Sequence, residues 1–186
     1  GLEQREFVAV RIDQRRESLE EHAAVSGRHA APRAAVDGRP CGGDGTVYVS
    51  DNVISQIIAV KDGTPSVFAE GEELLEWPNG VLVDGDRLIV GGWGKPPEIN
   101  GHLFAIDLKT KAKTLIAQMP VGQIDGVESD GRGGFVVTDW MAGKIIHVTA
   151  AGEIKDLQTF MPGTADLAYV ADKQIAIVDR KSTRLN

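Results

Sequence analysis

The sequence lacks the features that mark several large protein classes. A single cysteine among 186 residues excludes a disulfide framework and a cysteine-based zinc site. No apolar run approaches the ~20 residues needed to span a bilayer, so we expect no membrane contact. The net charge is −7, and Lys and Arg form no cluster in the apolar part, which argues against nucleic acid as the main partner. The first residues are charged and show no intact signal peptide. We leave the compartment of this soluble chain open, and a periplasmic or secreted parent stays among the alternatives because the true N-terminus is not visible.

Glycine, by contrast, is abundant, and the composition changes near residue 44. The chain has 22 glycines, above the usual share of about 7%, which predicts many turns. Residues 1–43 hold seven arginines and no lysine, whereas residues 44–186 hold 20 acids against 13 bases. Residues 1–43 show no strand alternation, so we expect an irregular or helical segment there, in which the one periodic stretch, Phe7–Val25, could form a polar helix. We divide the chain into 1–43, which is either an appended extension or the product of a frame error, then 44–179, and a tail at 180–186.

The tail resembles translated adapter text, so we expect the natural protein to continue beyond Asp179.

Between residues 44 and 179 the chain repeats one pattern of short apolar strands. The equivalent positions Ile57, Leu103 and Ile145 are 46 and 42 residues apart. Four short strands in every ~40–45 residues are the signature of a β-propeller blade. We therefore predict an all-β fold, a partial β-propeller of about three to three and a half four-stranded blades. A β-sandwich with similar strand spacing is the alternative.

Propeller geometry locates a candidate site. The first strand of each blade lines the central channel and the second runs antiparallel beside it, so the start of one and the end of the other share a face. Oxygen-bearing side chains recur there, and such a ring suits a hard divalent cation. The first strands begin at Asn79, Asp125 and Asp166, and the second strands end at Asp51, Asp139 and Asp179.

The simpler interpretation of an Asn or Asp beside glycine is a turn cap, in which the side chain accepts hydrogen bonds from nearby backbone amides. We expect that role for Asp62, Asp84 and Asp130. The loop at 94–100 opens on the mouth of the channel, and two prolines stiffen it, so it could form a rim or lid.

The aromatic and histidine side chains are expected to make contacts or to have structural roles, and none is expected to react. Trp93 and Trp140 follow the second strands on the mouth face, where they could stack on a substrate ring or pack as part of the rim. His102 and His147 are interpreted as structural or solvated. No Gly-x-Ser-x-Gly motif or other nucleophile triad is present.

Two stretches carry a family resemblance. WPNGVLVDGDRLIVGGWG (77–94) and QIDGVESDGRGGFVVTDW (123–140) resemble the senescence-marker-protein/gluconolactonase/luciferin-regenerating-enzyme family. The resemblance implies a six-bladed propeller, of which residues 44–179 form about half, and a single divalent metal in the channel. It implies that Asn79 is an amide ligand, and that Asp125 is a carboxylate ligand and the general base. The metal would be calcium, magnesium, manganese or zinc.

The resemblance also implies a reaction, which is the hydrolysis of a sugar lactone or related ester by metal-activated water. Trp93, Asp139, Trp140 and Asp166 are candidate substrate contacts on the same face. We expect the half-ring alone to be inactive, because the blade that supplies the family's metal-binding glutamate is absent. The other function class that we consider is a non-enzymatic propeller that binds a protein or carbohydrate partner. The oligomeric state is left open.

Overall fold

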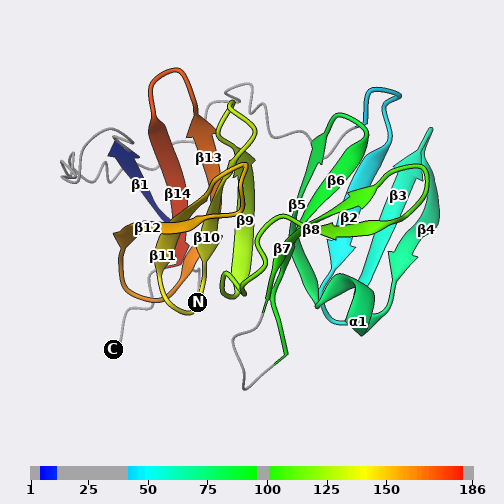
Figure 1. Ribbon diagram of the computed structural model, residues 1–186, viewed down its shortest axis with the longest axis horizontal. Helices are drawn as coiled ribbons and strands as arrows, with labels where there is room; N and C mark the ends of the chain where they lie inside the picture. Colours follow the sequence, from blue (N-terminus) through cyan, green and yellow to red (C-terminus); the bar gives the residue numbers. More distant parts are fainter. Residues whose placement is uncertain (1–4, 12–41, 96–100, 182–186) are drawn as a thin grey trace.

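The protein is built almost entirely of antiparallel β-sheets. A computed structural model describes residues 5–11, 42–95 and 101–181. Four separate sheets succeed one another along the chain (Figure 1). Strand neighbours within each sheet are consecutive in sequence, except where the N-terminal strand joins the last sheet. This arrangement is a partial β-propeller, as the repeat predicts, and we call the sheets blades 1 to 4.

Blades 2 and 3 have four strands each, in sequential order from the innermost outward. Their strands correspond to the second and third sequence repeats together with the short strand before each. Blade 2 contains β5 (Pro78–Asp84), β6 (Arg87–Gly92), β7 (Leu103–Asp107) and β8 (Lys113–Leu115). Blade 3 contains β9 (Ile124–Ser129), β10 (Phe135–Asp139), β11 (Lys144–Val148) and β12 (Ile154–Thr159).

Blades 1 and 4 have three strands each among the described residues. A short helix, α1 (Glu72–Leu75), connects blade 1 to blade 2. Blade 1 contains β2 (Val47–Asp51), β3 (Gln56–Lys61) and β4 (Thr64–Glu70). Blade 4 contains β13 (Thr164–Val170), β14 (Ile175–Lys181) and β1 (Arg5–Arg11).

The N-terminal strand differs from the sequence-based expectation. The sequence favours an irregular segment or a polar helix from Phe7, but the backbone of β1 is extended and pairs antiparallel with β14, from Arg5 opposite Lys181 to Arg11 opposite Ile175. A helix here would have only a weak apolar stripe to bury, whereas the extended strand pairs with β14 and covers its otherwise open edge. The rest of the expected helix, 12–25, lies outside the described residues. β14 also extends two residues beyond the expected boundary at 179.

Hairpin turns form where the Asp-Gly pairs predict them. Asp62 and Gly63 both have positive φ, 50° and 75°, as a two-residue hairpin loop between β3 and β4 requires. Gly85 (φ 63°) begins the loop between β5 and β6. These turns set the strand register, and with it the side chains that face the core.

Each pair of neighbouring blades shares an apolar layer. The equivalent repeat positions Ile57 on β3, Leu103 on β7 and Ile145 on β11 are all fully buried. Burying one such side chain contributes roughly 1.5–3 kcal/mol, so these layers hold the blades together. The layers include Ile57 and Phe104 between blades 1 and 2, Ile89 and Phe135 between blades 2 and 3, and Ile145 and Val178 between blades 3 and 4.

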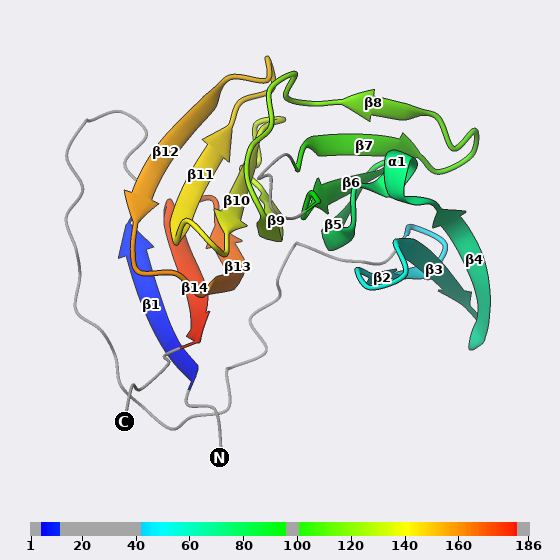
Figure 2. The same ribbon diagram turned by 90° about the horizontal axis from the view of Figure 1, so that it is seen from below.

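The blades stand side by side in an arc with β5, β9 and β13 innermost in blades 2, 3 and 4 (Figure 2). These three strands run in the same direction. Their starts, together with the ends of the second strands, lie on one face, which we call the mouth face. The hairpins that join the first strand to the second, and the third to the fourth, lie on the opposite face. Within the described ranges, no helix is long and apolar enough to cross a membrane.

Candidate functional site

The three inner strands begin next to one another on the mouth face. A Cβ atom on Gly80 would overlap the backbone carbonyl oxygen of Asp125, and one on Gly126 would lie 3.0 Å from the Cα of Asp166. Glycine at both positions therefore allows neighbouring strands to approach closely. As a result, Asn79, Asp125 and Asp166 occupy successive positions around the channel.

Asn79 and Asp125 are both half-buried, on β5 and β9. The backbone carbonyl oxygen of Asn79 accepts a hydrogen bond of 2.5 Å from the hydroxyl group of Ser50 on β2. This bond ties the start of β5 to blade 1. The side-chain amide of Asn79 forms no hydrogen bond with any other residue that the structure describes, so its oxygen is available to a ligand.

Asp166 differs from its two neighbours in its electrostatic surroundings. Its side chain reaches solvent, yet the protein packed around it raises the pKa of its carboxyl group. The negative charge of Asp179 adds to this rise, while a 2.9 Å hydrogen bond from the backbone amide of Leu167 opposes it. Asp166 therefore holds a proton more readily than an ordinary surface aspartate.

Two of the three aspartates expected at the ends of second strands, Asp51 and Asp139, cap turns. Asp51 Oδ1 accepts hydrogen bonds from the backbone amides of Val53 (3.0 Å) and Ile54 (3.3 Å). Asp139 is only 4% exposed, and its Oδ1 accepts a 2.9 Å bond from the amide of Ala142. Burial raises the pKa of Asp139, while these backbone bonds lower it. Two members of the expected oxygen ring thus serve the backbone, and little of the Asp139 surface is left for a substrate.

The two expected tryptophans lie half-buried at the mouth face. The backbone amide of Trp93 donates to the carbonyl oxygen of Trp77 (2.9 Å), and that of Trp140 donates to Gln123 (3.0 Å). Both bonds connect the end of a second strand to the segment that leads into the inner strand of the same blade. The role of Trp93 and Trp140 as substrate contacts stays a prediction.

Glu76 is the centre of a polar cluster that the sequence did not predict. Its Oε2 accepts hydrogen bonds from the backbone amide (2.9 Å) and Nδ1 (2.8 Å) of His102, and its Oε1 pairs with Lys113 Nζ at 2.7 Å. All three side chains are about one-fifth exposed. Burial alone would raise the pKa of Glu76, but the bonds from Lys113 and His102 outweigh it and lower that pKa.

This cluster positions the segment that leads to Asn79. Glu76 and Trp77 both have left-handed backbones, with φ of 51° and 55°, which is uncommon for residues other than glycine. The backbone carbonyl oxygen of Glu76 accepts a 3.0 Å bond from the amide of Gly94, while its carboxylate holds His102. Glu76 therefore fastens both ends of the loop expected to form a rim. Residues 96–100 of that loop lie outside the described residues.

His102 could not be linked to Glu76 from sequence, because the two are 26 positions apart. His102 lies one residue before β7, and its structural interpretation agrees with these contacts. The only local signal is that Glu76 stands three residues before Asn79.

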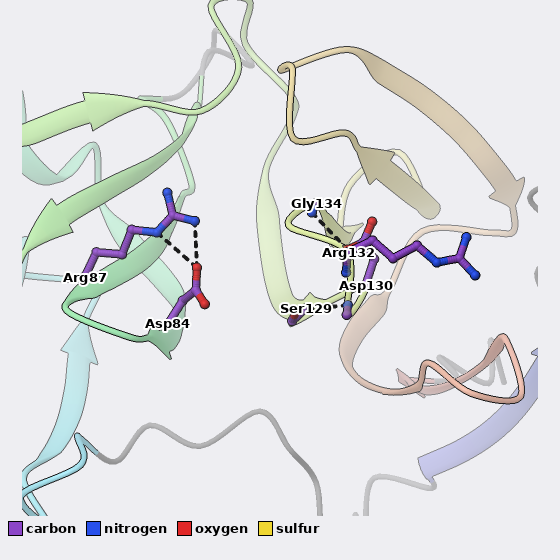
Figure 3. Close-up of polar contacts among 7 residues, drawn as sticks. Asp84, Arg87, Ser129, Asp130, Arg132 and Gly134 are labelled. Atoms are coloured by element: carbon purple, nitrogen blue, oxygen red, sulfur yellow. Dashed lines mark hydrogen bonds and ion pairs between the residues drawn. The ribbon is translucent and has the colours of Figure 1, made fainter.

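Residues on the opposite face have structural roles (Figure 3). Asp130 Oδ1 accepts bonds from the amides of Arg132 (2.7 Å) and Gly134 (2.9 Å), and its Oδ2 lies 2.9 Å from Nε2 of His147. These contacts lower the pKa of Asp130 although burial opposes them. The capping role expected for Asp130 is confirmed, as is the structural interpretation of His147.

Asp84 is not a backbone cap. Its Oδ2 instead pairs with the guanidinium group of Arg87, at 2.7 and 3.0 Å, across the hairpin (Figure 3). A cavity of about 520 Å³ lies on the same face, between blades 2 and 3, lined in part by Arg87, Asp107 and Phe135. It opens away from Asn79 and Asp125, so it is separate from the mouth-face site.

The side chains on the mouth face supply only some of the ligands that a divalent cation needs. Asn79 and Asp125 offer an amide and a carboxylate oxygen, which are suitable ligands for hard cations. Among the residues that the structure describes, no group of three or more His, Cys, Asp or Glu side chains could hold a metal ion. A metal at this site would need further ligands from water, substrate or additional protein.

Comparison with known proteins identifies the fold. No family model matches the chain, and no curated protein matches it either. A chain of the nidogen/laminin complex matches with a TM-score of 0.56 and 17% identity, over 67% of this chain and 48% of that chain. The virginiamycin B lyase of Staphylococcus aureus matches with a TM-score of 0.55 and 14% identity, over 75% and 50%. Both are β-propeller proteins, and at these identities the likeness shows the fold alone. The chain spans about half the length of the propellers that it matches.

Proposed function

We propose that this half-ring belongs to a metal-dependent lactone hydrolase with its site on the mouth face. The observation that carries the proposal is the succession of Asn79, Asp125 and Asp166 at the starts of neighbouring inner strands, enforced by the close contacts of Gly80 and Gly126. The resemblance of the segments around Asn79 and Asp125 to the gluconolactonase-type family supports the same assignment.

In this proposal Asn79 and Asp125 hold one divalent cation, either calcium, magnesium, manganese or zinc. When bound, such a cation would polarise the lactone carbonyl group and lower the pKa of a water molecule that it holds. Asp125 accepts the proton of the attacking water. The water oxygen bonds to the carbonyl carbon, the ring C–O bond breaks, and the departing alkoxide takes up a proton, which gives the hydroxy acid.

Asp166 is a candidate proton source for that departing oxygen. The surrounding protein and the charge of Asp179 raise its pKa, so more of it is protonated than of an ordinary aspartate. Trp93 and Trp140 would pack against the sugar or ester substrate at the mouth. Glu76 would act indirectly, because it fixes the segment that leads to Asn79.

The proposal is tested by metal-dependent thermal stabilisation of the purified chain. A ligand that binds only the folded state raises stability by RT ln(1 + [L]/Kd), or about 2.7 kcal/mol at one hundred times Kd. We expect at least one of the four cations to raise Tm and Asp125→Asn to remove most of that rise. Asp62→Asn is the matched control, because Asp62 lies in a hairpin on the opposite face and asparagine also tolerates its positive φ.

A second candidate is a non-enzymatic propeller that binds a protein or carbohydrate partner. One specific observation favours it: all three methionines are exposed on loops of the mouth face, Met119 at 68%, Met141 at 49% and Met161 at 74%. Methionine-rich surfaces adapt to varied partners. If none of the four cations changes Tm, this candidate replaces the hydrolase.

A further inference from the structure

Three loops around blade 3 form an apolar rim on the mouth face. They are residues 119–122, which lead toward β9, residues 140–143, between β10 and β11, and residues 160–163, between β12 and β13. These twelve residues include no charged side chain, and their only side-chain N–H or O–H group is the indole N–H of Trp140. Blades 2, 3 and 4 flank the loops on both sides, and blades pack side by side around the channel. The exposed side chains of the rim are therefore not surfaces that a neighbouring blade of the ring covers.

Each loop of the rim exposes one methionine. The exposed fractions are 68% for Met119, 49% for Met141 and 74% for Met161. Pro120 and Pro162, which follow two of these methionines, are exposed as well. Methionine side chains are flexible and polarisable, so they adapt to apolar ligands of varied shape. The rim thus offers apolar contact and almost no side-chain hydrogen-bond partner.

Backbone hydrogen bonds join the three loops through Trp140. Its amide donates to the carbonyl oxygen of Gln123 (3.0 Å), and its own carbonyl oxygen accepts from the amide of Gly163 (2.8 Å). The amide of Phe160 donates to the carbonyl oxygen of Gly143 (2.7 Å). A Cβ atom on Gly143 would lie 2.6 Å from the carbonyl oxygen of Phe160, so glycine lets the two turns meet this closely. The rim is therefore one connected surface.

The rim adjoins the proposed metal site. Gln123, whose carbonyl oxygen holds Trp140, stands two residues before Asp125. A ligand whose reacting carbonyl group lies at Asn79 and Asp125 would extend its remaining part over Trp140 toward the methionines. Hydroxyl groups on that part would lose water without gaining a side-chain partner, which is unfavourable. An aliphatic chain in the same place would gain from leaving water.

We propose that the rim binds an aliphatic chain carried by the substrate, so that the substrate class is an alkyl-substituted lactone rather than a polyhydroxylated one. This inference rests on the proposed hydrolase function, because that function places the reacting group at Asp125. Burial of one CH₂ group contributes about 0.8 kcal/mol, which corresponds to about a fourfold gain in affinity.

The inference is tested by calorimetric titration of the purified 186-residue chain with δ-lactones of increasing alkyl chain length. We expect each added CH₂ group to raise the affinity about two- to fourfold until the chain reaches past the rim. The rise should occur with and without a divalent cation, because the rim itself contains no metal ligand. Glucono-δ-lactone, which has hydroxyl groups in place of the chain, should bind more weakly than the longest alkyl lactone.

Two substitutions test whether the methionines hold the chain. Met141→Gln and Met161→Gln keep the length of the side chain but add a polar amide. Each should weaken binding of the longest lactone about three- to tenfold and leave binding of the unsubstituted δ-lactone unchanged. Ile154→Gln is the matched control, because Ile154 is exposed at the start of β12, on the opposite face of the same blade.

The outcomes separate this inference from the hydrolase proposal. An affinity that does not rise with chain length, or glucono-δ-lactone that binds as tightly as the longest alkyl lactone, would overturn the aliphatic rim whatever the cations do. A rise that both methionine variants leave intact would place the chain elsewhere and overturn it too. A rise that these variants reduce, in a protein whose Tm no cation changes, would keep the rim as an aliphatic-chain site and remove the hydrolase. Far-UV circular dichroism verifies that each variant is folded, and Met119→Gln replaces either variant if it unfolds.

Discussion

At the scale of single residues, position in the blade decides the role of an aspartate more than its sequence neighbours do. Both Asp125, near the start of β9, and Asp139, at the end of β10, lie on the mouth face. Asp139 is buried and accepts the amide of Ala142, whereas Asp125 is half-buried beside Asn79. Both kinds of aspartate fit the same sequence pattern, so the pattern could not separate a cap from a ligand candidate. What identifies Asp139 as a cap is the turn that follows it, which directs the backbone amide of Ala142 at its carboxylate.

Glu76 provides a prediction at this scale. Glu76→Gln removes the charge that pairs with Lys113 and His102, and hydrogen bonds to charged groups contribute about 1.5–3 kcal/mol. We expect the free energy of unfolding at pH 7 to fall by about that amount in urea titrations. Glu72→Gln, at an exposed position in the first turn of α1, should change it by less than about 0.5 kcal/mol.

The effect of Glu76→Gln should depend on pH. The pKa of Glu76 is lower in the folded protein than in the unfolded chain, so its carboxylate stabilises the fold fully above the ordinary value of about 4.3. This stabilisation is lost as pH falls through the lower folded value. The variant should therefore lose much less stability relative to wild type at pH 3 than at pH 7. An equal loss at both would contradict an ionic role for Glu76.

At the scale of strands and turns, local sequence predicted most of the structure. Hairpin signals such as Asp62-Gly63 and the spacing of Ile57, Leu103 and Ile145 define strands that the structure confirms. The strand at Arg5–Arg11 was missed, because its partner β14 is about 170 residues away and only the open edge of that strand favours the extended form. Propensity within a short window contains no information about such a partner.

The close approach of inner strands gives a second prediction. A Cβ on Gly126 would lie 2.9 Å from the backbone nitrogen of Leu167 and 3.0 Å from the Cα of Asp166, and backbone atoms cannot move cheaply. Gly126→Ala should therefore lower the free energy of unfolding by about 1–3 kcal/mol. Because it separates β9 from β13, it should also weaken any metal-dependent rise in Tm.

Gly43→Ala is the matched control for this substitution. A Cβ on Gly43 would meet no atom within 4 Å, so the same chemical change should leave both the unfolding free energy and the metal response unaltered. If Gly126→Ala unfolds no more easily than Gly43→Ala, the inner strands are not packed as closely as described, and the adjacency of Asn79, Asp125 and Asp166 loses its support.

At the scale of the whole molecule, the repeat predicted a propeller, but it could not predict what covers the two end blades. That depends on surfaces that come together only once four sheets have packed in an arc. Val67 and Ile177 lie on the two end blades and belong to none of the three apolar layers.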